Sequence, residues 1–128
     1  MLDVTDIASH IKRDQRIVAA YLLGSAVADR LRPDSDLDIA VLPARGTPWS
    51  ATDTLELATS LSVVVGRTVD VGVLSSRNLI YASQALLTGE RFFCRDMFVA
   101  DLTAAALLGL AVQFRFERKE IVDVYAAG

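Results

Sequence analysis

Acidic side chains interrupt two short apolar segments of this sequence, and this pattern limits how the chain can fold. The stretch from Asp36 to Ile39 alternates acidic and apolar side chains, as a strand with one polar face does. Residues two apart in a strand point to the same face, about 6.8 Å apart along the chain, so Asp36 and Asp38 project together. Asp70 lies in a second apolar segment, where a lone buried carboxylate would be unfavourable. If the two segments pair at the usual strand spacing of about 4.8 Å, the three carboxylates form one cluster.

Such a cluster favours a bound cation, because like charges repel one another unless a cation neutralises them. Hard divalent ions prefer oxygen ligands together with bound phosphate, so we expect Asp36, Asp38 and Asp70 to bind one or two Mg²⁺ ions and to be catalytic. Such ions polarise a transferring phosphoryl group and lower the pKa of an attacking hydroxyl. Taken singly, the same residues have simpler interpretations. Asp36 and Asp38 suit a turn or a solvent-facing strand edge, and Asp70 suits a paired structural acid.

A Gly24-Ser25 pair lies between a predicted strand and a predicted helix. Free N–H groups at the start of a helix favour an anionic phosphate, and Gly24 lets the backbone approach it closely. The Ser25 hydroxyl is suited to donate a hydrogen bond to a β- or γ-phosphate oxygen. We therefore expect Gly24 and Ser25 to bind a nucleoside triphosphate beside the acids, although a helix cap is the default interpretation of the pair alone.

The remaining pattern predicts an α+β fold in which a small mixed sheet is flanked by helices, with a helical C-terminal region. Expected strands cover residues 17–23, 36–42, 68–74 and 91–94, the last at a sheet edge. Expected helices cover residues 5–13 with Thr5 or Asp3 as cap, 26–31, 50–65 from a Ser50 or Thr52 cap to Gly66, 78–87 up to Gly89, and 96–125 with a break near Gly109 or around Phe114 to Phe116.

Length and composition restrict the class of protein. The 128 residues fit one domain, 1–128, with a catalytic core at about 15–96 and a helical segment at about 97–126. A net charge of -3 argues against direct nucleic-acid binding. The single Cys94 excludes an internal disulfide, and the N-terminus lacks a secretory pattern, so we expect a cytoplasmic protein. Residues 102–114 form the longest apolar stretch, which is too short to span a membrane and suits a buried helix.

Hydrophobic residues make up 52% of the chain, which is high for a small domain with much surface to keep polar. This excess points to apolar surface that a partner covers. Whether the chain also forms an oligomer stays open.

Gly24-Ser25, ten further residues, Asp36-x-Asp38 and a later strand acid resemble the signature of the DNA polymerase beta-like nucleotidyltransferases. The chain most resembles the minimal nucleotidyltransferase (MNT) family, over about residues 21–96. The resemblance includes the Gly89-Glu90-Arg91 turn and the Arg95-Asp96 pair. It implies a polymerase beta-like palm fold, metal binding by Asp36 and Asp38, activation of the incoming hydroxyl by Asp70, and binding of the triphosphate by Gly24 and Ser25.

One segment departs from the pattern of that family. Many similar proteins carry Ala-Arg-Gly just after Gly-Ser, whereas this chain has Ala26-Val27-Ala28-Asp29. A contact to the nucleotide is therefore missing. Arg30 or Arg32 is a candidate to replace it, and the alternative for either is a solvated loop charge.

The resemblance implies transfer of a nucleoside monophosphate, AMP from ATP, to a hydroxyl of a partner protein. The expected partner is a HEPN-domain ribonuclease toxin, which the chain would neutralise as an antitoxin by tyrosine AMPylation. The short chain leaves few residues for an acceptor pocket, which fits an acceptor that is itself a protein. The alternatives are steric masking of the partner without catalysis, through the apolar C-terminal helix, and nucleotidylation of a small molecule, as in aminoglycoside-modifying enzymes.

Overall fold

The computed structural model describes residues 4–29, 32 and 35–127. It confirms the α+β class, and most of the expected elements lie within a few residues of their predicted bounds. In chain order they are α1 (Thr5–Lys12), β1 (Ile17–Leu23), the 3₁₀ helix η1 (Gly24–Asp29), β2 (Leu37–Pro43), α2 (Ala51–Val65), β3 (Val69–Val73), α3 (Leu79–Thr88), β4 (Glu90–Cys94) and α4 (Met97–Ala127).

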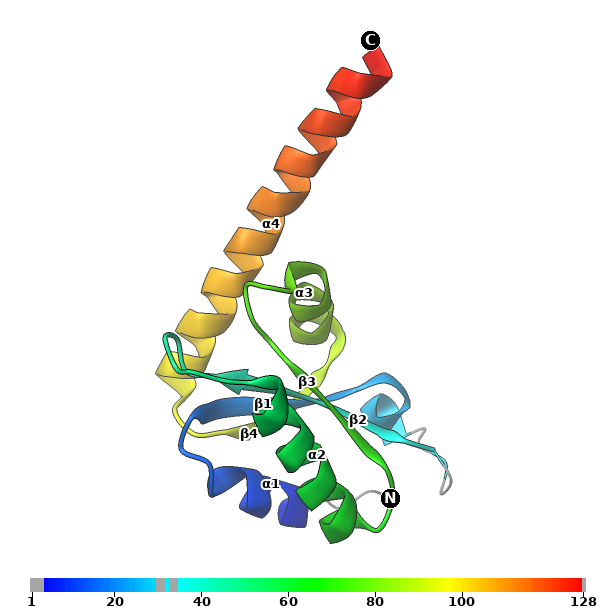
Figure 1. The fold of residues 1–128 in the computed structure, drawn as a ribbon, viewed down its shortest axis with the longest axis vertical. Helices are drawn as coiled ribbons and strands as arrows, with labels where there is room; N and C mark the ends of the chain where they lie inside the picture. Colours follow the sequence, from blue (N-terminus) through cyan, green and yellow to red (C-terminus); the bar gives the residue numbers. More distant parts are fainter. Residues whose placement is uncertain (1–3, 30–31, 33–34, 128) are drawn as a thin grey trace.

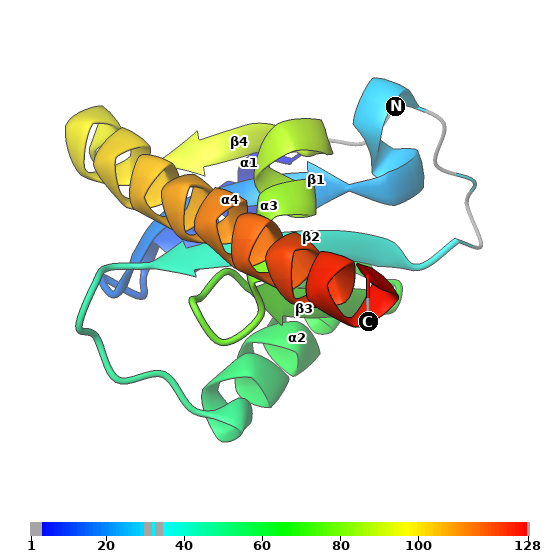
Figure 2. The same ribbon diagram turned by 90° about the horizontal axis from the view of Figure 1, so that it is seen from above.

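The strands form a mixed sheet in the order β3-β2-β1-β4. β1 pairs antiparallel with both β2 and β4, whereas β2 and β3 are parallel and are connected through α2. Helices α1 and α2 cover one face of the sheet, and α3 and α4 cover the other (Figure 1). Figure 2 looks onto the face that carries α3 and α4. The two acidic strands are therefore neighbours, as their sequences predict.

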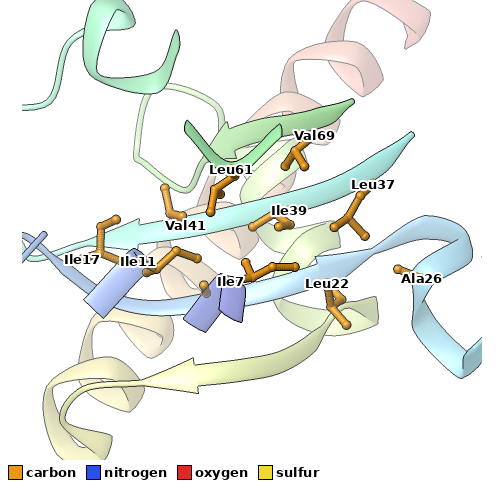
Figure 3. Packing of buried hydrophobic residues seen from close by; sticks show 11 residues of the cluster. Ile7, Ile11, Ile17, Leu22, Ala26, Leu37, Ile39, Val41, Leu61 and Val69 are labelled. Carbon is orange, nitrogen blue, oxygen red and sulfur yellow. The ribbon is translucent and has the colours of Figure 1, made fainter. Parts of the chain in front are cut away.

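Alternation along β2 determines which side chains face which helices. Every second residue of β2 packs against α1 and α2 in a core of branched aliphatic side chains (Figure 3). This core contains Ile7, Ile11, Ile17, Leu22, Leu37, Ile39, Val41, Leu61 and Val69. The residues between them, Asp38, Ala40 and Leu42, consequently face α3 and α4. Ala40 and Leu42 are buried there, and Asp38 is exposed at the start of the strand.

The ends of α2 follow from local hydrogen bonds. Ser50 Oγ accepts from the Asp53 backbone N–H at 3.1 Å, and the Asp53 carboxylate accepts from the Ser50 backbone N–H at 2.8 Å. Gly66 ends the helix with φ 77°, a left-handed conformation that favours glycine. Ser50 is thus the cap, and Thr52 lies inside the helix. In α1 the cap position is Val4, so the expected cap at Thr5 is wrong, and Asp3 lies outside the described residues.

Helix α4 differs from its prediction in two ways. It runs unbroken for 31 residues, so the expected break near Gly109 or around Phe114 to Phe116 is wrong. The expectation of a buried helix is also wrong for most of its surface. One narrow stripe is buried against the body of the protein, and it consists of Ala100, Thr103, Leu107 and Ala111. Beyond this stripe the C-terminal half extends away from the sheet (Figure 1).

Several large apolar side chains on α4 face solvent as a result. Phe98 is 76% exposed, Val112 68% and Phe116 69%. By length and composition alone, Met97–Lys119 would suffice to cross a membrane, so the expectation that this apolar stretch is too short is wrong. A mostly buried core helix of a globular protein passes the same test. The exposed side chains fit the expectation from composition that a partner covers apolar surface of this chain.

Leu61 and Leu55 provide a test of this packing within one helix. Leu61 is fully buried against the sheet, whereas Leu55 is 68% exposed. Leu61→Ala should lower the free energy of unfolding by about 2–5 kcal/mol, because it leaves a cavity in the core. Leu55→Ala should change it by less than about 0.5 kcal/mol. Urea unfolding followed by circular dichroism measures both, and equal effects would contradict the burial of Leu61 in the core.

Candidate active site

Asp38 and Asp70 occupy paired positions on neighbouring strands. In the parallel register of β2 and β3, Leu37 pairs with Val69 and Asp38 pairs with Asp70. Both carboxylates therefore project from the face that α3 and α4 cover, at the starting ends of the strands, where both residues are exposed. This is the pairing that the sequence predicts.

The third acid, Asp36, immediately precedes β2 and is also exposed. Partial burial raises the pKa of Asp38, and the negative charges of Asp70 and Asp36 raise it further. The three carboxylates are therefore close enough to act on one another. Within the described ranges, however, no three Asp, Glu, His or Cys side chains are arranged to hold a single ion. The fold brings the acids close together, but their carboxylates do not converge on a single ion position.

Gly24 lies directly beside these acids. Leu23 at the end of β1 pairs with Asp38, and Gly24 follows with φ 60°, which is left-handed backbone. A Cβ placed on Gly24 would lie 3.4 Å from Asp38 Oδ2, so the turn packs against the carboxylate. Ser25 belongs to η1, which begins at Gly24 rather than at the expected residue 26. The side chain of Ser25 lies outside the part of the chain that the structure describes.

A pocket of about 450 Å³ opens next to the acids, and Asp38 and Asp70 are part of its lining. Leu23, Asn78 and Tyr81 also line it, together with strand residues 71–73. The pocket joins the starting ends of the acidic strands to the first turns of α3. Its position beside two carboxylates makes it the candidate site for a nucleotide.

Tyr81, the largest polar side chain in this pocket, was not predicted from the sequence. A Cβ on Gly72 would clash with the Tyr81 hydroxyl and ring, so the aromatic ring lies against the backbone of β3 at this glycine. Burial raises the pKa of Tyr81, and the charge of Asp38 raises it further. Gly72 was the sequence feature that could have indicated this contact, because a glycine inside a strand often marks a place where another group closely approaches the backbone. The sequence did not show which side chain approaches it.

A larger pocket, of about 550 Å³, lies at the opposite ends of β2 and β3. Its lining includes Arg45 and Arg77 but none of the predicted site residues. Of the two pockets, only the smaller one is therefore lined by predicted site residues, Asp38 and Asp70.

Two further residues of the family pattern have structural roles. Arg95 donates hydrogen bonds to the backbone carbonyls of Lys12, Asp14 and Ile17, at 2.7, 3.2 and 3.0 Å. These hydrogen bonds connect the end of β4 to the loop between α1 and β1. Asp96 Oδ1 accepts from the Val99 backbone N–H at 3.0 Å and caps the start of α4.

The two arginines considered as substitutes for the missing nucleotide contact are only partly described. Arg30 lies outside the described residues. Arg32 is exposed, and its backbone carbonyl accepts a hydrogen bond from Arg67 Nη1 at 3.0 Å. This contact connects the loop to the segment that leads into β3. Arg32 is not among the residues that line the pocket.

Comparison with solved structures places this geometry among known folds. A crystal structure of a toxin-antitoxin with AMP-PNP matches with a TM-score of 0.80 and 23% identity, over 98% of this chain and 99% of that one. A toxin-antitoxin MntA-HepT structure matches with a TM-score of 0.70 and 23% identity, over 97% and 99%. A tri-AMPylated Shewanella oneidensis HEPN toxin in complex with MNT antitoxin matches with a TM-score of 0.69 and 25% identity, over 94% and 96%.

No curated protein matches the chain. The family model of polymerase beta nucleotidyltransferases matches residues 5–98, a range that contains the whole sheet and all three acids. The chain therefore belongs to the polymerase beta nucleotidyltransferase family.

Proposed function

We propose that this nucleotidyltransferase transfers AMP from ATP to a hydroxyl of a partner protein, in a reaction that depends on a divalent metal and releases pyrophosphate. The observation that carries the proposal is the pairing of Asp38 with Asp70 beside Gly24. Repelling carboxylates next to a glycine turn and a pocket suit a cation and a polyphosphate better than they suit a purely structural role.

The donor set fits Mg²⁺, because it offers carboxylate oxygens at an exposed position and no sulfur or imidazole. Asp36, Asp38 and Asp70 would hold one or two ions. When bound, Mg²⁺ would neutralise negative charge on the transferring phosphoryl group and on the leaving oxygen. Gly24 lets the triphosphate approach the backbone, and the Ser25 hydroxyl donates to it. Asp70 lines the pocket and accepts the proton of the incoming hydroxyl.

The proposed partner is a HEPN-domain toxin, which the chain neutralises as an antitoxin by tyrosine AMPylation. Its similarity to MNT antitoxins solved with such toxins supports this, and in one of those structures the toxin is AMPylated. The chain would act in the cytoplasm as one domain, with its reaction in residues 15–96. The exposed apolar side chains of α4 would contact the partner.

Steric masking is the second candidate function, because a partner that binds the exposed apolar side chains of α4 would be covered without any catalysis. Masking and nucleotidylation differ in their need for the acids. A chain that only masks should neutralise its partner fully after the carboxylates are removed.

Asp38→Asn/Asp70→Asn should lower the rate of partner labelling at least about 100-fold, because it removes proposed metal ligands and the proposed base. The measurement is transfer of radiolabel from α-labelled ATP to the purified toxin with Mg²⁺. Glu56→Gln is the matched control, since Glu56 is an exposed acid on α2, which covers the opposite face. Full neutralisation of the toxin by the double variant, with no label transferred, would favour masking.

Gly24→Ala should weaken binding of ATP with Mg²⁺ about tenfold, which corresponds to about 1.4 kcal/mol. The added methyl group would occupy the space between the turn and Asp38. Gly46→Ala is the control, because Gly46 has φ 76° and its added Cβ would meet nothing within 4 Å. Both variants should lose about 1–2 kcal/mol of stability to left-handed backbone. Isothermal titration calorimetry separates them, and equal affinities would argue against a triphosphate at this turn.

Asp38→Asn should raise the melting temperature of the metal-free protein at neutral pH. Since folding raises the pKa of Asp38, the native state binds this proton more tightly than the unfolded chain does. The contribution of Asp38 to the stability of the native protein therefore falls as pH rises from the unfolded pKa, about 3.9, through the folded value.

The advantage of the variant should appear above about pH 4 and vanish below it. It should stay below about 1 kcal/mol, because exposed charges are screened. Thermal unfolding in EDTA measures the difference, and Mg²⁺ should stabilise the wild type more than the variant. A wild type that is more stable than the variant throughout this range without metal would contradict the repulsion.

A further inference from the structure

Tyr81 brings a phenolic hydroxyl into the pocket that contains the acids. The residue lies on α3, and its hydroxyl and ring pack on the backbone of β3 at Gly72. Gly72 follows Asp70 by two residues, so both positions belong to the same face of the strand. Tyr81, Asp38 and Asp70 line one pocket. A hydroxyl of this chain therefore lies where the proposed reaction needs an acceptor.

The Gly24 turn and Tyr81 lie on opposite sides of Asp38. Gly24 follows β1, which pairs with β2 along one edge. Gly72, on which the Tyr81 ring packs, belongs to β3, which pairs with β2 along the other edge. Phosphoryl transfer requires the attacking and leaving oxygens to be roughly in line. A triphosphate bound at the Gly24 turn would have its leaving pyrophosphate on the β1 side. Tyr81 approaches from the β3 side, which is the side of the proposed base, Asp70.

We propose that Tyr81 is a nucleotidylation site and that the chain transfers AMP to its own tyrosine when no partner supplies a hydroxyl. This inference rests on the proposed function and adds an intramolecular acceptor to the same site. The reaction requires a nucleoside triphosphate and a divalent cation, as the proposed reaction does.

The step balances as an ordinary substitution at phosphorus. The Tyr81 hydroxyl oxygen forms a bond to the α-phosphorus of ATP, and the bond from that phosphorus to the bridging oxygen of the β-phosphate breaks. Pyrophosphate leaves with the electron pair of that bond. The phenolic proton passes to the Asp70 carboxylate and then to solvent. The product is a tyrosine–AMP phosphodiester on α3.

Tyr81 is better placed for this reaction than Tyr21. Within the described part of the chain no hydrogen bond engages the Tyr81 hydroxyl. Tyr21 is only 5% exposed, and its phenol lies near the positive charge of Arg91. The side chain of Tyr125 lies outside the described residues. Tyr21 and Tyr81, the tyrosines whose side chains the structure describes, therefore form a matched pair for a test.

The experiment incubates the full chain alone with ATP and Mg²⁺, measures its intact mass and maps the adduct by tandem mass spectrometry. The wild type should gain the mass of one AMP group, on the peptide that contains Tyr81. Tyr81→Phe should lose the adduct while the ring still packs on Gly72, which an unchanged thermal melt verifies. Tyr21→Phe should retain the adduct, and Asp38→Asn should lose it.

A binding readout without turnover uses 3-fluorotyrosine incorporated throughout the chain and α,β-methylene-ATP, whose α–β bridge resists cleavage. The nucleotide with Mg²⁺ should shift the fluorine resonance of Tyr81, which is assigned by its loss in Tyr81→Phe. The resonance of Tyr21 should stay unchanged.

Labelling of the toxin by the same wild-type preparation separates this inference from the proposed function. If the toxin is labelled and the chain alone carries no adduct, or carries it away from Tyr81, the inference is wrong and the proposed function stands. If neither protein is labelled, both are wrong. An adduct on Tyr81 together with a shifted Tyr81 resonance supports the inference.

Discussion

The repulsion between Asp38 and Asp70 is the constraint on which the rest of the site depends. Opposite each carboxylate, on the other face of the sheet, buried aliphatic side chains pack against α1 and α2. A shift of the register by one residue would turn these side chains to solvent and move the acids into the core. The apolar face therefore holds the two charges side by side, although their repulsion alone would separate them.

The helices on the acidic face cover only part of it. α3 and α4 bury Ala40, Leu42 and Leu74, which lie further along the strands than the acids do. Asp38 and Asp70 remain open at the starting ends, and Tyr81 stands at the boundary between the covered and the open part. One sheet face thus supplies both a hydrophobic core and the candidate site for charged ligands. The boundary fixes the depth of the pocket, because α3 forms one of its walls.

The elements with local signals were predictable from sequence, and those that depend on tertiary contacts were not. Strand alternation around Asp38, the Ser50 cap and the Gly66 stop each act within a few residues, so the sequence showed them directly. The approach of Tyr81 to Gly72 joins two elements through side-chain packing, which no local pattern encodes. The pairing of Asp38 with Asp70 was inferable only because a lone acid in a strand needs a partner.

The burial of helix α4 also depends on tertiary contacts, so it was not predictable from sequence. Its apolar composition suggested burial, yet its buried stripe is narrow and contains small residues such as Ala100 and Ala111. Small side chains let α4 approach the body closely, and the large side chains, Phe98 and Phe116 among them, are left on the outside. A helix sequence reveals how much apolar surface exists, but it does not reveal which molecule covers that surface. In this chain the exposed apolar side chains of α4 lie outside the pocket of the acids, so the proposed partner contact and the proposed phosphoryl transfer would occupy separate surfaces. An acceptor docked on α4 would have to extend a hydroxyl to the strand ends, whereas Tyr81 is already there.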